Sequence, residues 1–140
     1  MSKILINLKN ITEDAFSINN NILDDSSINL EPHVGINFTT DINNNLFIAD
    51  AQIALLTPDS SIGVALRFRY ILEILNLKDL EHTFDEESGI TNFKFPKGFV
   101  KSVITDVYAT GRVLLANHLK GTRYEYSYLP FNGAESLLNR

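Results

Sequence analysis

The residues that could carry chemistry are few and scattered. The three histidines, His33, His82 and His118, lie far apart, and none has a second ligand at metal-binding spacing such as an i, i+4 pair. The absence of cysteine excludes disulfides, thiolate metal sites and thiol nucleophiles. We therefore interpret the histidines as surface or hydrogen-bonded residues, and we expect no bound metal.

Other residue types give no stronger sign of catalysis. The acidic run Asp85-Glu86-Glu87 lacks the twelve-residue pattern of a calcium loop and is more typical of a solvated turn. Carboxylate pairs for acid–base work, glycine-rich phosphate loops and nucleophile-elbow motifs are not evident. The sequence thus predicts a protein that is not an enzyme and needs no cofactor.

Three tyrosines alternate near the C-terminal end, at Tyr124, Tyr126 and Tyr128. They could stack on a ligand, but alternation at period two is more typical of one face of a strand. We favour a core or groove wall over a stacking platform.

Composition limits the class of protein. A length of 140 residues predicts a single domain over 1–140, and 44% hydrophobic with 21% charged residues is ordinary globular usage. There is no apolar run of about 18 residues and no signal-peptide pattern, so we expect a cytoplasmic protein without a membrane span. The net charge is -5, and the basic residues of the first sixty are only Lys3 and Lys9, which makes nucleic acid a poor partner.

The elements of the first half are predicted from hydrophobic spacing. Residues 4–9 alternate as a short strand, and the polar stretch 12–27 is interpreted as a long crossover. Residues 28–39 alternate at period two, and Pro32 places this strand at an edge or bulge. Residues 46–56 and 62–74 follow after short turns, which predicts an antiparallel meander.

The second half predicts helices. Residues 76–95 are interpreted as a charged, irregular connector. A helix is predicted over 96–118, with Pro96 in its first turn and Gly111 allowing close helix–helix approach. Asn132 resembles a cap for a short terminal helix. The predicted fold class is α+β: a four-stranded antiparallel sheet with the long helix and the short C-terminal helix packed on one face.

Size suggests that this sheet is not fully covered. A helix of about 23 residues is near 35 Å long and about 10 Å wide, enough to cover roughly two of four strands. Apolar surface left uncovered indicates partners, either identical subunits or clients. The predicted oligomer interface lies along the helix: Val100, Val103, Val107, Gly111 and Leu114.

The order of elements and several short motifs resemble the SecB protein-export chaperone family. The motifs are Phe95-Pro96 opening the long helix, Ile104 before Ala109-Thr110-Gly111-Arg112, Leu129-Pro130-Phe131-Asn132 before the last helix, and Ala15-Phe16-Ser17-Ile18.

The resemblance implies an ATP-independent holdase that binds unfolded polypeptides, including preproteins for export, and assembles as a homotetramer. It also implies apolar client grooves between the second strand, the crossover and the terminal helix. Their walls would be Phe16, Ile18, Ile22, Leu23, Leu30, Val34, Ile36, Leu129, Phe131, Leu137 and Leu138.

Partners beyond the client stay open. The family docks on a SecA-type motor through acids on the outer sheet face, where this chain has Arg67 and Arg69 instead. A SecB-like chaperone for an antitoxin or another local client is therefore an alternative. A small-ligand-binding α+β domain and a purely structural subunit are the other two.

Overall fold

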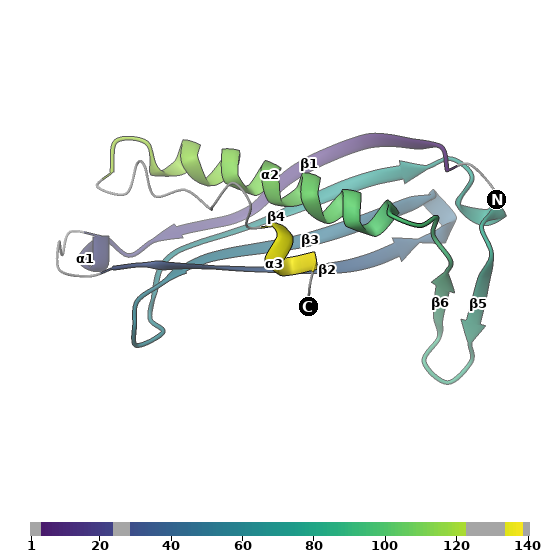
Figure 1. Cartoon of the computed structure of the whole chain (residues 1–140), viewed down its shortest axis with the longest axis horizontal. Coiled ribbons are helices and arrows are strands. Elements are labelled where there is room, and N and C mark those ends of the chain that lie inside the picture. Colours follow the sequence, from purple (N-terminus) through teal and green to yellow (C-terminus); the bar gives the residue numbers. More distant parts are fainter. Residues whose placement is uncertain (1–3, 24–28, 123–133, 139–140) are drawn as a thin grey trace.

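The computed structural model describes residues 4–23, 29–122 and 134–138, with the side chains of Leu23 and Ser136 left aside. It is an α+β fold in which one long helix lies across one face of a four-stranded antiparallel sheet (Figure 1). The strands are β1 (Ile6–Ile18), β2 (Glu31–Asp41), β3 (Leu46–Leu56), β4 (Ile62–Ile74), β5 (His82–Asp85) and β6 (Ile90–Phe93). The helices are α1 (Asn20–Leu23), α2 (Phe99–Leu119) and α3 (Ala134–Leu138), with 3-10 turns η1 (Ile42–Asn44) and η2 (Leu77–Asp79).

The predicted meander of β2, β3 and β4 is confirmed. The sheet order is β1-β4-β3-β2, so β1 and β2 are the edge strands. Register is continuous from Glu31 opposite Leu56 to Asp41 opposite Leu46. Asn45 takes the left-handed conformation that closes the turn before β3, at φ 59°.

The prediction that residues 12–27 form a crossover is wrong for 12–18, which belong to β1. Two register irregularities interrupt β1, between Leu8 and Asn10 and between Glu13 and Ala15. Each shifts the phase of the alternation, so that Leu8, Ile11 and Phe16 all lie opposite residues of β4 that are buried. Because the apolar spacing is broken by the bulges, period two is lost from the sequence although the strand continues.

The connector between β4 and α2 is not irregular, contrary to the sequence prediction. It contains η2 and a hairpin of β5 and β6, which projects from the body of the molecule (Figure 1). Asp85 builds the turn by accepting bonds from the Glu87 amide at 3.1 Å and the Ser88 hydroxyl at 3.0 Å. Strands of four residues are too short for a periodicity signal.

The core lies between α2 and the inner face of β3 and β4. Val103 and Val107 are buried against the sheet, and a Cβ on Gly111 would lie 2.6 Å from Ile53 Cδ1. The close approach at Gly111 within the chain is therefore between helix and sheet. A helix–helix approach between copies of the chain stays a prediction. These three predicted interface residues belong to the core of the single chain, whereas Val100 and Leu114 keep more exposed surface. No helix in the described residues is long and apolar enough to cross a membrane.

Candidate functional site

The clearest apolar cluster among the predicted groove residues surrounds Gly63 of β4. A Cβ built on Gly63 would lie 3.1 Å from Leu30 Cδ2 and 3.3 Å from Ile22 Cγ2, so both side chains rest on the strand backbone. The Asn19 amide donates to the Gly63 carbonyl at 2.8 Å, which holds the start of α1 against β4. Ile18 lies beside this contact, opposite Val64. We call Ile18, Ile22 and Leu30 the Gly63 cluster.

A second group of predicted groove residues follows the inner face of edge strand β2. Val34 and Ile36 alternate along the strand, and both are half-buried and pack against the core. Leu137 of α3 also packs against the core, and α3 contacts α2. Because β2 is an edge strand, this apolar face adjoins an edge whose backbone groups have no neighbouring strand among the described residues.

Phe16 lies elsewhere, beneath the C-terminal half of α2. Its ring stacks on His118 with centroids 3.8 Å apart and planes 15° from parallel. His118 Nε2 also lies 3.0 Å from Glu13 Oε1. Phe16 thus fastens β1 to α2, two residues before Ile18 of the Gly63 cluster.

The remaining predicted groove residues are Leu23, Leu129, Phe131 and Leu138. Leu129 and Phe131 lie outside the described residues, as do Tyr124, Tyr126 and Tyr128. Leu23 ends α1, but its side chain is not described. Leu138 is half-buried at the end of α3.

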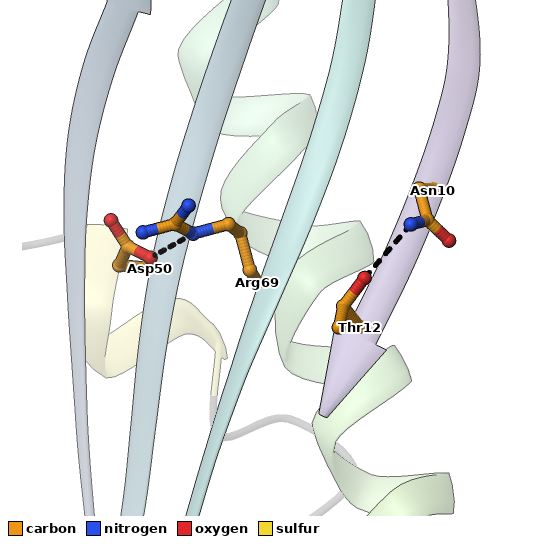
Figure 2. A network of polar contacts seen from close by, with 4 residues as sticks. All are labelled: Asn10, Thr12, Asp50 and Arg69. Carbon is orange, nitrogen blue, oxygen red and sulfur yellow. Dashed lines mark hydrogen bonds and ion pairs between the residues drawn. The ribbon is translucent and has the colours of Figure 1, made fainter. Parts of the chain in front are cut away.

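The outer face of the sheet is polar where Arg67 and Arg69 project from β4. Arg69 Nε donates to Asp50 Oδ1 of β3 at 2.9 Å, and Asn10 donates to Thr12 on β1 (Figure 2). The hydrogen bond and negative charge of Asp50 raise the pKa of Arg69 above its ordinary value. Arg67 is exposed nearby. This face therefore carries fixed charges of both signs.

One apolar surface was missed from the sequence. Leu5, Ile6 and Leu8 at the start of β1 are between 39% and 54% exposed, and Leu75 beside them is 53% exposed. The Leu75 amide donates to the Leu5 carbonyl at 2.9 Å, which brings the two segments together. We call these four residues the β1 patch. The sequence feature that could have predicted this patch is the presence of apolar residues on both faces of the segment 4–8.

A hydrogen bond between two side chains joins the sheet to α2. The Tyr70 hydroxyl of β4 donates a hydrogen bond to Asp106 of α2. Burial first, and then this bond, raise the pKa of Tyr70 well above its ordinary value. In the described part of the chain, no group of three or more His, Asp or Glu side chains is placed to hold a metal ion. The site is thus defined by apolar surface.

Comparison with known proteins finds no matching family model and no matching curated protein.

Proposed function

We propose that the chain is an ATP-independent holdase chaperone that binds unfolded polypeptides on the Gly63 cluster and the inner face of β2. The observation that carries this proposal is the position of half-buried apolar side chains beside an edge strand. An extended client could pair with the β2 backbone while its alternate side chains meet Val34 and Ile36.

Exposed apolar residues support two kinds of binding, to a client and to further copies of the chain. The β1 patch and Phe84, which is 61% exposed, leave large apolar side chains in water. Exposed apolar surface marks interaction sites where the residues adjoin one another, as do Leu5 and Leu75, whose backbones are hydrogen-bonded. We propose that the chain forms a homo-oligomer, a tetramer, and acts in the cytoplasm. In this tetramer Val100 and Leu114 of α2 would be buried between chains. Light scattering should then give a mass several times 15.8 kDa, and a monomer at micromolar concentration would contradict it.

Of two possible kinds of client, we favour one that is not handed to an export motor, such as an antitoxin. The other is a preprotein delivered to a SecA-type motor. Arg67 and Arg69 on the outer face support this choice, because an acidic docking face for a motor is absent at these positions of β4. A preprotein client remains compatible with the same groove, since the apolar contacts do not depend on a motor.

The test combines client binding with stability. Reduced, denatured client is diluted with the protein, and suppression of light scattering at near-stoichiometric amounts is measured. Replacing Ile22 and Leu30 together by Ser removes the two side chains that rest on Gly63. Burying such a side chain is worth about 1.5–3 kcal/mol, so losing both should weaken client binding about tenfold or more.

A matched control is Val113→Ser, which removes an exposed apolar side chain of α2 away from the groove. It should leave client binding unchanged. If the Ile22→Ser/Leu30→Ser variant melts at a lower temperature but its folded fraction binds client as wild type does, these residues are core and the groove assignment fails. Failure of the wild-type chain to suppress scattering would refute the holdase proposal itself.

A further inference from the structure

A cavity of about 550 Å³ lies between the β5–β6 hairpin and the adjoining ends of β2 and β3. It is separate from the Gly63 cluster, since none of Ile18, Ile22 or Leu30 lines it. Its volume falls within the range of about 300–1,000 Å³ that is typical of small-molecule sites.

Four phenylalanine rings define the walls and floor. Phe47 of β3 is buried and gives a fixed floor, with the Phe38 ring 5.3 Å from it and the Phe95 ring 5.1 Å from it in an edge-on arrangement. Phe93 of the hairpin continues the row, 6.1 Å from Phe95. Rings at these spacings offer both faces and edges to a further aromatic ring, which is the geometry that aromatic pairs prefer.

The polar groups of the lining are uncharged. Thr39 and Thr40 of β2 and Thr91 of β6 are hydroxyl residues of the lining, Asn92 is an amide residue, and none of the described lining residues is charged. Burying an ion there would cost solvation that no opposite charge in the lining repays. The lining therefore favours a neutral ligand, with one or two hydrogen-bonding groups placed at the threonines.

The hairpin has a physical reason to need such an occupant. An isolated two-stranded hairpin is marginally stable in water, and this one has exposed Phe84 and Ile90 near its tip. Phe93 already packs against the core, and a ring seated between Phe93 and the sheet would add to that contact.

We propose that this cavity binds a small, uncharged aromatic compound carrying a hydroxyl or similar polar group. The proposal is independent of the holdase function, because it uses different residues.

The test uses 2-naphthol as the neutral probe and naphthalene-2-sulfonate as its anionic counterpart. The chain has no tryptophan, so naphthalene fluorescence can be followed with little protein background. We expect saturable binding of 2-naphthol to one site per chain with a change in its emission, and much weaker binding of the sulfonate. Absence of saturable 2-naphthol binding, or equal binding of the sulfonate, would overturn the proposal.

Two variants on the same hairpin locate the site. Thr91→Phe fills the cavity from its β6 wall and suits a strand, so binding should weaken about tenfold or more. Thr83→Phe makes the same change on β5 at an exposed residue outside the lining, and should leave binding unchanged. Melting curves of both variants should show a cooperative transition, as expected of folded chains. Unchanged 2-naphthol binding by folded Thr91→Phe would exclude this cavity, while the Ile22→Ser/Leu30→Ser variant should bind the probe as wild type does.

Discussion

Gly111 offers the sharpest test of how α2 sits on the sheet. In the structure a Cβ at this position would approach Ile53 Cδ1 to 2.6 Å and two Phe68 ring atoms to 3.3 and 3.4 Å. The first distance is shorter than real contacts allow, and Ile53 is only 2% exposed, so its terminal methyl group has little space into which to move. Gly111→Ala should therefore overpack the core.

The expected magnitude is a difference of two opposing effects. Replacing glycine by alanine inside a helix stabilises it by about 0.5–1 kcal/mol. Overpacking a filled core costs about 1–3 kcal/mol. We expect a net loss of about 1 kcal/mol in the free energy of unfolding, which for a chain of this size lowers the melting temperature by about 3–6 °C.

Urea unfolding of wild type and four variants separates the helix-propensity effect from the packing effect. Ala109→Gly, at an exposed position of the same helix, measures the helix-propensity term alone. Ile53→Val removes the methyl group that clashes, and by itself should cost about 0.5–1.5 kcal/mol. In the Gly111→Ala background the same change should cost less, giving a favourable coupling energy near 1 kcal/mol.

The outcome also decides between two roles for Gly111. If Gly111→Ala stabilises the chain and shows no coupling to Ile53→Val, the packing argument is refuted. If instead the variant keeps its stability but loses oligomer mass in light scattering, the glycine serves a helix–helix contact, as the sequence alone suggested.

Two further predictions concern polar ties to α2. Because the pKa of Tyr70 is raised in the folded chain, its stabilising contribution is complete below about pH 10 and is lost as pH rises through the raised value. The free energy of unfolding should thus fall more steeply above pH 10 in wild type than in Tyr70→Phe, and equal slopes would contradict this. The Glu13–His118 contact is partly exposed, so Glu13→Gln should cost less than about 1 kcal/mol in urea unfolding, with a smaller difference at high salt. A larger, salt-independent loss would show that Glu13 acts through packing instead.

The sequence predicted those parts of the fold whose periodicity is unbroken. β2, β3 and β4 alternate between clear turns, and the apolar stripe of α2 keeps helical spacing. β1 was predicted too short because its bulges interrupt the alternation, and the hairpin was missed because each strand has four residues.

The candidate sites also differ in how far the sequence predicts them. Alternation predicted that Leu30, Val34 and Ile36 share one face, and all three pack against the core. Their role in a groove came from the family resemblance and stays a prediction. The wall that Ile22 and Leu30 share exists only because the β4 backbone at Gly63 lacks a side chain, which spacing within either segment does not reveal. The aromatic cavity combines residues 38–47 with residues 89–95, and only tertiary packing places them together.

The two faces of the sheet favour different uses. On the outer face, a client lying across β3 and β4 would have to strip water from the Asp50–Arg69 pair and from exposed Arg67. Desolvating ions costs several kcal/mol unless new partners replace the water, and an unfolded apolar segment brings none. On the inner face, Val34, Ile36 and the Gly63 cluster present half-buried apolar side chains whose further burial releases water at no such cost. If the chain is the holdase that we propose, it should bind an apolar client beside β2 rather than on the opposite face, and charge reversal at Arg67 should leave that activity unchanged.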